Sequence, residues 1–155
     1  MRASTSRSPH GFMPNAEAYG AGSPLVFDTS AWVRRRAPRV LDRWALTRER
    51  ELLASCPVVA LELLSGARDE TAFTGLDAAL RALVQAPVTR AACEAALSAA
   101  RGLRGKRRLP SADYLIAAAA AERGAGVLHY DHHFDILCRE LGIESVWIAP
   151  PGSLD

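Results

Sequence analysis

Two patterns of apolar and polar residues alternate along the chain and together predict an α/β fold. Short β-prone runs predict five buried strands, at residues 25–27, 57–60, 87–89, 127–130 and 144–148. Apolar residues at three- and four-residue steps predict helices at residues 31–53, with an interruption at Pro38, and at residues 61–66, 70–84, 90–100, 112–123 and 132–141. Strands that alternate with helices favour a parallel, doubly wound sheet with helices on both faces.

Residues 109–131, LPSADYLIAAAAAERGAGVLHYD, contain the most clearly marked of these helices. Ser111 is a favourable N-cap, Asp113 complements the helix dipole in the first turn, and Gly124 suits a left-handed residue at the end of the helix. The alanine run at residues 117–121 leaves almost no polar face, so we expect a buried helix. Thr89 is the expected N-cap of the preceding helix.

Four acidic residues stand where strands end or helices begin. Asp28 and Asp131 end predicted strands, Glu62 follows a third strand, and Asp113 opens a helix. Each one alone has an ordinary structural role as a helix cap, a partner of the helix dipole or an exposed acid. Because the carboxyl ends of parallel strands meet at one edge of a sheet, we expect the four to converge there. Converging carboxylates repel one another unless a cation neutralises them, and Mg²⁺ or Mn²⁺ with a bound water can hydrolyse a phosphodiester.

The length of 155 residues suits one domain, which we place at residues 25–150 and which is long enough to bury a core. Residues 1–24 are rich in Ser, Gly, Pro and Arg and lack the apolar core of a secretory signal. A disordered leader or an upstream start codon explains this segment. Residues 151–155 form a tail.

Three cysteines, Cys56, Cys93 and Cys138, are widely spaced and lie within or beside apolar segments. We expect buried free thiols in a reducing compartment, and therefore a cytoplasmic protein. No apolar run approaches the length needed to cross a bilayer, so no membrane partner is expected.

The net charge is only +2, but the basic residues are clustered. Arginines at residues 34–36 form one cluster and Arg104, Lys106, Arg107 and Arg108 form another. Arginine binds phosphate through its guanidinium fork, although a solvated surface or a salt-bridge network explains either cluster taken alone. Beside a phosphate-cleaving site, the second cluster becomes a candidate for RNA binding.

The four acidic blocks resemble those of PIN-domain ribonucleases, especially VapC toxins of bacterial toxin–antitoxin pairs. The resemblance covers residues 25 to about 150 and lies in DTSA at Asp28, VALELLSGAR at Glu62, SADYLIAAAAAERG at Asp113 and LHYDHHFDIL at Asp131. It implies a three-layer α/β/α sandwich with a short five-stranded parallel sheet. It also implies a Mg²⁺- or Mn²⁺-dependent endoribonuclease that cuts structured RNA such as transfer or ribosomal RNA, works as a homodimer and is inhibited by a VapB-like antitoxin.

Carried over position by position, the resemblance gives each acid a role. Asp28, Asp113 and Asp131 match the metal ligands, and Glu62 matches an acid that acts on the attacking water or supports the ligands. Candidates for supporting contacts are Thr29, Ser30 and Asp135, although exposure or capping is the more ordinary role for Asp135.

Three histidines, His129, His132 and His133, surround Asp131, but their spacing does not specify a zinc site. Strand alternation places His129 on the same face as Asp131. A contact with substrate phosphate and a plain surface role remain open for these residues.

Other enzyme and signalling classes with an α/β fold require residues that this chain lacks. A haloacid-dehalogenase-like phosphatase needs an acid at position 30, which is Ser, and a receiver domain needs a lysine after a late strand, whereas the chain has only Lys106, in a loop. A catalytically silent RNA-binding or partner-binding module is expected to have lost acids, and all four are present. A nuclease of RNA processing, outside any toxin–antitoxin pair, stays as an alternative.

Overall fold

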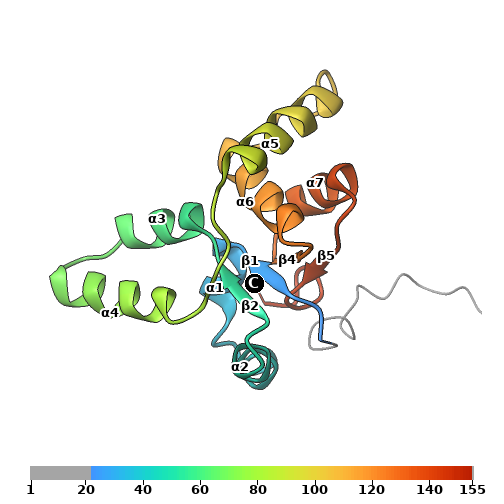
Figure 1. Ribbon diagram of the computed structural model, residues 1–155. Helices are drawn as coiled ribbons and strands as arrows, with labels where there is room; N and C mark the ends of the chain where they lie inside the picture. Colours follow the sequence, from blue (N-terminus) through green and yellow to red (C-terminus); the bar gives the residue numbers. More distant parts are fainter. Residues whose placement is uncertain (1–21, 155) are drawn as a thin grey trace, which may run out of the picture.

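A five-stranded parallel sheet forms the centre of the computed structural model, which describes residues 22–154 (Figure 1). Its strands are β1 (Leu25–Phe27), β2 (Leu53–Ser55), β3 (Val84–Gln85), β4 (Gly126–His129) and β5 (Ser145–Trp147), in the order β3-β2-β1-β4-β5. All four strand pairs are parallel, and the register places Phe27 beside Leu128. The predicted α/β class with a parallel five-stranded sheet is confirmed.

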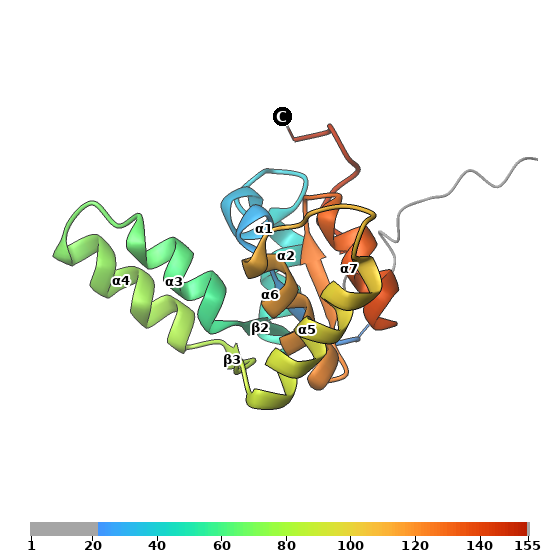
Figure 2. The ribbon, with the colours of Figure 1, turned by 90° about the horizontal axis from the view of Figure 1, so that it is seen from above.

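Seven helices surround this sheet within the described residues. They are α1 (Thr29–Arg34), α2 (Leu41–Glu49), α3 (Pro57–Ser65), α4 (Glu70–Arg81), α5 (Arg90–Leu103), α6 (Ser111–Glu122) and α7 (His133–Leu141). Helix α2 lies on one side of the sheet and α5, α6 and α7 lie on the other, whereas α3 and α4 form a hairpin that projects from the body (Figures 1 and 2). The layers are therefore helix, sheet and helix, with an appended hairpin.

The core is apolar on both faces of the sheet because the strands are covered by helices on each side. Every residue of β1 and β4 is buried. On one face, Phe27 packs against Trp32 of α1 and Trp44 of α2, with ring centroids 5.3 and 5.4 Å away. These aromatic contacts fix the first strand against α1, and so fix the position of the residue between them, Asp28.

Helix α6 is buried, as the alanine run predicts, and residues 116–120 are inaccessible to solvent. Ala118 packs against Ala92 and Ala96 of α5, so small side chains on both helices allow close approach. The predicted N-cap is wrong: Pro110 occupies that position and Ser111 is already helical. The fixed φ of proline, here −60° with an extended ψ of 140°, ends the preceding loop without a side-chain cap. Gly124 has a φ of +64°, as predicted.

Two strands were predicted in the wrong place. Residues 57–60 form the start of α3, because Pro57 fits the first helical turn, where its missing N–H costs nothing. The strand lies earlier, at Leu53–Ser55, so the predicted helix over residues 31–53 is instead two helices, of which α1 ends at Arg34 and α2 ends at Glu49. Strand β3 is Val84–Gln85 rather than residues 87–89, since Pro87 has no N–H to pair with β2.

The other boundaries differ little from the predictions. Thr89 caps α5 through its hydroxyl, which accepts a hydrogen bond from the amide of Ala92 at 3.1 Å. Helix α5 extends to Leu103, beyond the predicted end at residue 100, and α4 ends at Arg81 because the chain then enters β3. The predicted leader lies almost wholly at residues 1–21, outside the described residues.

All three cysteines are free, but only two of them are buried. Cys56 and Cys138 are fully buried, and burial raises the pKa of the Cys138 thiol to about 12. Such a thiol is inert at neutral pH. Cys93 is half-buried on α5, contrary to the prediction, because it faces a surface hollow rather than the core. Along residues 22–154 no helix has the length and apolar character that a bilayer-spanning segment requires.

Candidate active site

The candidate site lies where the chain order of the strands reverses. Strands β1 and β4 are neighbours in the sheet, but the helices that follow them lie on different parts of the sheet. In open parallel sheets a crevice forms outside the carboxyl ends of two strands arranged in this way. Asp28 directly follows β1, and Asp131 comes two residues after β4. The amide of Asp28 donates a hydrogen bond to the carbonyl of Leu128 at 2.9 Å, which fixes the two strand ends together.

Asp28 is the most enclosed of the four acids, with 6% of its surface exposed. It caps α1, and its Oδ2 accepts hydrogen bonds from the amide of Ser30 at 2.9 Å and from the Ser30 hydroxyl at 2.6 Å. Burial raises the pKa of the Asp28 carboxyl, the hydrogen bonds from Ser30 oppose that rise, and the nearby charge of Glu62 adds to it. A buried carboxylate with a raised pKa is a group that gains from a bound cation.

Ser30 has a second role that the sequence did not specify. Its hydroxyl oxygen accepts a hydrogen bond from the amide of Tyr130 at 2.9 Å while its proton goes to Asp28. One hydroxyl therefore joins the turn after β1 to the end of β4. The expectation that Ser30 partners Asp28 agrees with these contacts.

Asp113 lies opposite, in the first turn of α6, and faces His133 at the start of α7. His133 Nδ1 lies 2.9 Å from Asp113 Oδ2 and 3.6 Å from Asp131 Oδ2. Burial raises the pKa of the Asp113 carboxyl; the hydrogen bond from His133 lowers it, and the charges of Asp28 and Asp131 raise it again. Asp113 is therefore close enough to Asp28 and Asp131 for their charges to act on it.

Asp131 is held by the start of α7. Its Oδ1 accepts a hydrogen bond from the amide of His133 at 2.9 Å, and 41% of the side chain remains exposed. Its second oxygen, Oδ2, faces His133. One oxygen thus anchors the residue and the other faces the shared site.

Glu62 reaches the site from α3 rather than from a strand end. The predicted strand before it is a helix, yet its Oε2 accepts a hydrogen bond from the hydroxyl of Thr29, next to Asp28. The carboxylate is exposed, in contrast to that of Asp28. Its position at the open side of the site suits contact with solvent or substrate.

The remaining predicted neighbours do not join the acids. His132 is exposed and packs against Trp147, with ring centroids 4.7 Å apart. Asp135 is neither a simple surface acid nor part of the cluster, because its Oδ1 accepts hydrogen bonds from Ser145 and Trp147 at 2.6 and 3.1 Å. His129 is fully buried beneath Asp131, and burial lowers its pKa to about 4. It is therefore neutral at physiological pH.

Among the described residues, Asp113, Asp131 and His133 form a group that could hold a metal ion, since one ligand atom from each lies within 4.8 Å of the others. Asp28 is close enough for its charge to raise the pKa of Asp113. Carboxylate oxygens favour Mg²⁺ or Mn²⁺, and one imidazole among them is more acceptable to Mn²⁺. The sequence did not single out His133 from its neighbours, although its position four residues before the buried Leu137 on α7 and two residues after Asp131 was the available signal.

The two basic clusters have different surroundings. In the first, Arg34 stacks over Tyr130 and Arg35 over Trp32, at 4.2 and 3.7 Å from the ring centroids, so both are packed against aromatic residues. The second, at residues 104–108 and hereafter the basic segment, is exposed and lies in the loop that leads from α5 to α6. It borders a hollow with Leu103 and Tyr114, and Tyr114 is the residue next to Asp113.

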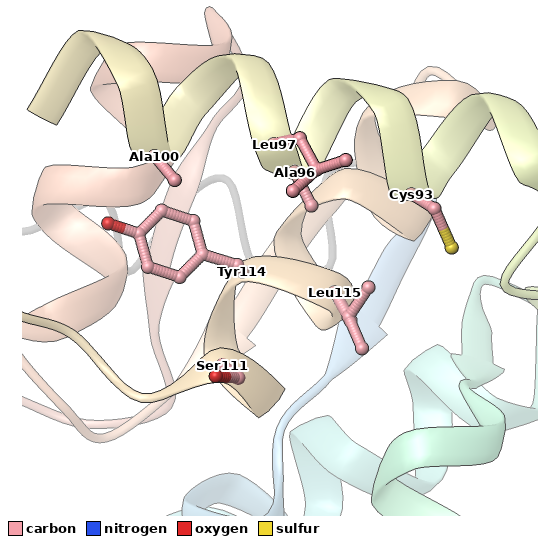
Figure 3. A pocket seen from close by; sticks show the side chains of 7 residues that line it. All are labelled: Cys93, Ala96, Leu97, Ala100, Ser111, Tyr114 and Leu115. Atoms are coloured by element: carbon pink, nitrogen blue, oxygen red, sulfur yellow. The ribbon is translucent and has the colours of Figure 1, made fainter.

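A separate apolar hollow lies between α5 and α6 (Figure 3). Leu97 from α5 and Leu115 from α6 lie over it, and Tyr114 closes the end nearer Ala100. Leu97 is 72% exposed, which is unusual for a large apolar side chain beside other apolar residues. The complete lining is Cys93, Ala96, Leu97, Ala100, Ser111, Tyr114 and Leu115.

The comparisons with known proteins agree with one another. A family model described as the PIN domain matches residues 25–140. Ribonuclease VapC18 of Mycobacterium tuberculosis is 36% identical over 138 residues, which cover 84% of this chain and 100% of the relative. Ribonuclease VapC51 of the same organism is 37% identical over 135 residues, with 84% of this chain and 96% of the relative covered.

Solved structures of similar fold are toxin–antitoxin complexes. The Mycobacterium tuberculosis VapBC-5 structure matches with a TM-score of 0.59 and 22% identity, over 81% of this chain and 98% of that one. DNA-bound VapBC from Salmonella typhimurium matches with a TM-score of 0.63 and 18% identity, over 82% and 99% of the two chains. At these identities the structures support the fold alone.

Proposed function

We propose that this chain, which belongs to the PIN domain family, is an endoribonuclease and the toxin of a toxin–antitoxin pair. The observation that carries the proposal is the meeting of Asp113, Asp131 and His133, whose ligand atoms lie within 4.8 Å of one another, close to Asp28 at the end of β1. The two relatives described above are named ribonucleases, and their similarity to this chain covers nearly their whole length. The chemistry of the site and the family agree.

The acids fit a divalent cation. Asp28 and Asp113 are carboxylates with raised pKa values, and the charges of Asp28 and Asp131 both act on Asp113, so a cation removes this repulsion. A bound Mg²⁺ or Mn²⁺ supplies a water of lowered pKa and stabilises charge on the phosphate oxygens. We assign Asp28, Asp113 and Asp131 as its ligands, with His133 beside them.

The other residues of the site orient these groups. Ser30 holds the carboxylate of Asp28 by two hydrogen bonds, and Thr29 holds that of Glu62 by one. Glu62 is exposed and negatively charged beside Asp28, so it suits the acceptance of a proton from the attacking water. The hydrolysis then breaks the bond from phosphorus to the leaving oxygen of the RNA.

We assign RNA binding to the basic segment, through Arg104, Lys106, Arg107 and Arg108. Their side chains are exposed and stand just before the helix that carries Asp113. Cations that contact the phosphate backbone position RNA without reading its sequence. A structured RNA, such as transfer or ribosomal RNA, presents several phosphates to such a segment at once.

Two protein partners complete the proposal. A VapB-like antitoxin is the expected inhibitor, since the solved structures of similar fold are toxin–antitoxin complexes. A second copy of the chain is the expected occupant of the hollow between α5 and α6, because Leu97 and Leu115 leave apolar surface there beside the helix of Asp113. Pairing through this hollow would bring two active sites near a common RNA. The reducing cytoplasm is the expected location, in line with the free thiols.

The proposed activity is tested with purified protein freed of its antitoxin. We expect cleavage of RNA with Mg²⁺ or Mn²⁺, none in EDTA, and a loss of about 100-fold or more in rate for Asp113→Asn, as is usual when a metal ligand or its charge is removed. Asp42→Asn, at an exposed acid of α2, is the matched control and should cleave at the native rate. Native rates for Asp113→Asn, or full activity in EDTA, would contradict the proposal.

A further inference from the structure

A continuous line of hydrogen bonds runs behind Asp131, away from the acid cluster. The amide N–H of Asp131 donates to His129 Nδ1 at 3.1 Å, and His129 Nε2 lies 2.7 Å from Ser145 Oγ. The Ser145 hydroxyl donates to Asp135 Oδ1 at 2.6 Å, and Trp147 Nε1 donates to the same oxygen at 3.1 Å. None of these side chains has a role in the chemistry proposed above.

The direction of every bond in this line is determined. A backbone N–H only donates, so Nδ1 of His129 carries a lone pair and the proton of the neutral ring is on Nε2. That proton goes to the oxygen of Ser145, whose own proton goes to the carboxylate of Asp135, which accepts. Asp135 therefore fixes the hydroxyl, the hydroxyl fixes the tautomer of His129, and the tautomer supplies the acceptor for Asp131.

The imidazole has no freedom to turn. His129 is completely buried, and its ring lies between Phe134 and Trp147, with centroids 5.3 and 4.9 Å away. Strand β4 ends at His129, so the chain beyond it leaves the sheet and Asp131 has no neighbouring strand to accept its N–H. Nδ1 of the His129 ring accepts this N–H in place of a strand carbonyl.

We propose that His129 is a positioning residue that, through Nδ1, fixes the backbone of Asp131 and so holds its carboxylate beside Asp113 in the metal site. The inference rests on the proposed function, since it is the metal site that requires Asp131 in place. Residues that orient the ligands of a metal typically change its affinity by about 10- to 100-fold when they are replaced.

Two replacements of His129 separate this role from simple packing. In His129→Asn the amide oxygen is bonded to Cγ, as Nδ1 is in histidine, and can accept the N–H of Asp131. In His129→Leu a methyl group stands there and accepts nothing. Both changes remove the ring between Phe134 and Trp147 and the bond to Ser145, so both lower the melting temperature.

The readouts are Mn²⁺ affinity by calorimetry on the protein without antitoxin, the melting temperature in EDTA, and amide hydrogen exchange at Asp131 by NMR. We expect His129→Leu to weaken Mn²⁺ binding about 10- to 100-fold and to speed exchange at Asp131. His129→Asn should restore both to within about threefold of native while its melting temperature stays low. Trp147→Phe keeps an aromatic ring against His129 and removes the indole N–H at the far end of the line, so it should keep native Mn²⁺ affinity.

Opposite results overturn the inference. In one such result, both His129 variants lose Mn²⁺ affinity in proportion to their loss in melting temperature; in another, His129→Leu binds Mn²⁺ as tightly as the native protein does. Either result would mean that His129 contributes packing alone and does not position Asp131. Failure of the native protein to bind Mn²⁺ contradicts the proposed function instead, and amide exchange at Asp131 still reports whether His129 holds that residue. Should His129→Leu not fold, Ser145→Ala removes the acceptor of Nε2 and is expected to weaken Mn²⁺ binding, with unchanged affinity counting against the proposal.

Discussion

Nδ1 of His133 lies 2.9 Å from Oδ2 of Asp113, although 20 residues separate the two in the sequence. The contact joins the starts of α6 and α7 at the candidate metal site. Mn²⁺ accepts an imidazole nitrogen as a ligand, whereas Mg²⁺ strongly prefers oxygen. We therefore expect His133→Ala to weaken Mn²⁺ binding about tenfold and to change the Mg²⁺ dependence of cleavage little.

The neighbouring residue provides the control for this prediction. His132→Ala alters an exposed ring that packs on Trp147, and it should leave the affinity for both ions unchanged. Calorimetric titration with Mn²⁺, and cleavage rates over a range of Mg²⁺ concentrations, give the comparison. Equal loss of both ions in His133→Ala would mean that the ring supports the carboxylates rather than selecting the ion.

Asp28→Asn should stabilise the metal-free protein while it removes activity. Burial raises the pKa of Asp28, so its protonation stabilises the fold; that contribution is complete below the unfolded value of 3.8 and is lost as the pH rises through the folded value. At pH 7 the buried charge is a cost that asparagine avoids. The amide oxygen of Asn can still accept both hydrogen bonds from Ser30, which share one oxygen of Asp28.

We expect the melting temperature of Asp28→Asn in EDTA at pH 7 to exceed that of the native protein by a few degrees. The gap should narrow as the pH falls towards the raised pKa of Asp28, where the native residue becomes neutral as well. Thermal unfolding from pH 4 to pH 8 measures both trends. A variant less stable than native at pH 7 would show that the charge of Asp28 is already compensated without a metal.

The sequence predicted those features that depend on local pattern. The sheet class follows from alternating elements, and the burial of α6 follows from its alanine run. The expected convergence of Asp28, Asp113 and Asp131 rests on their positions at the end of a strand or the start of a helix. The strand at residues 57–60 was wrong because Val58 and Val59 have high β propensity, and the helix-starting effect of Pro57 overrides it.

Contacts between distant segments were beyond the sequence. Nothing in the spacing of His133 and Asp113 shows that α7 starts beside α6, because that depends on how both helices pack on β4 and β5. The same holds for Ser30, whose hydroxyl meets the amide of Tyr130, 100 residues away. The periodicity of the sequence does not reveal residues that act through tertiary hydrogen bonds, whereas it does indicate residues at the ends of strands and helices.

Two glycines should respond to alanine in opposite ways. At Gly126, in β4, an added Cβ would lie 3.0 Å from the carbonyl oxygen of Glu144 and 3.2 Å from a methyl group of Leu25. Gly126→Ala should therefore cost about 1–3 kcal/mol of unfolding free energy, because it overpacks the sheet. At Gly75, in the exposed middle of α4, nothing lies within 4 Å of an added Cβ.

Gly75→Ala should stabilise the protein by about 0.5–1 kcal/mol, since alanine favours a helix over glycine. Urea unfolding of the two variants beside the native protein measures both effects. A loss of stability at Gly75 would indicate that the hairpin of α3 and α4 is under a constraint that its own helix propensity does not describe.

Leu97→Glu should dissociate the proposed homodimer. Leu97 is 72% exposed beside the hollow between α5 and α6, and a buried carboxylate there would have no partner (Figure 3). Light scattering during size-exclusion chromatography should show a change from dimer to monomer at the same protein concentration. Phe73→Glu, at an exposed apolar residue of α4, is the control and should stay dimeric. A dimeric Leu97→Glu would place the interface elsewhere.

Neutralising the basic segment should lower the salt dependence of RNA binding. Each phosphate contact contributes about 0.7 to the slope of log affinity against log salt for a single strand and about 0.9 for a duplex. Gln at all four basic positions should therefore reduce the slope by about three and weaken every RNA similarly, because these contacts carry no sequence information. The substituted residues are Arg104, Lys106, Arg107 and Arg108.

Fluorescence anisotropy in an Asp113→Asn background, which should not cleave its RNA, measures this slope. The control replaces four exposed arginines elsewhere with Gln, namely Arg39, Arg68, Arg81 and Arg90. It removes the same net charge, so a general electrostatic effect would alter both variants alike. If only the basic segment changes the slope, the RNA backbone lies along the loop before α6, and its phosphates pass from there to the carboxylates at Asp113. If the two variants match, RNA approaches the acids from another side.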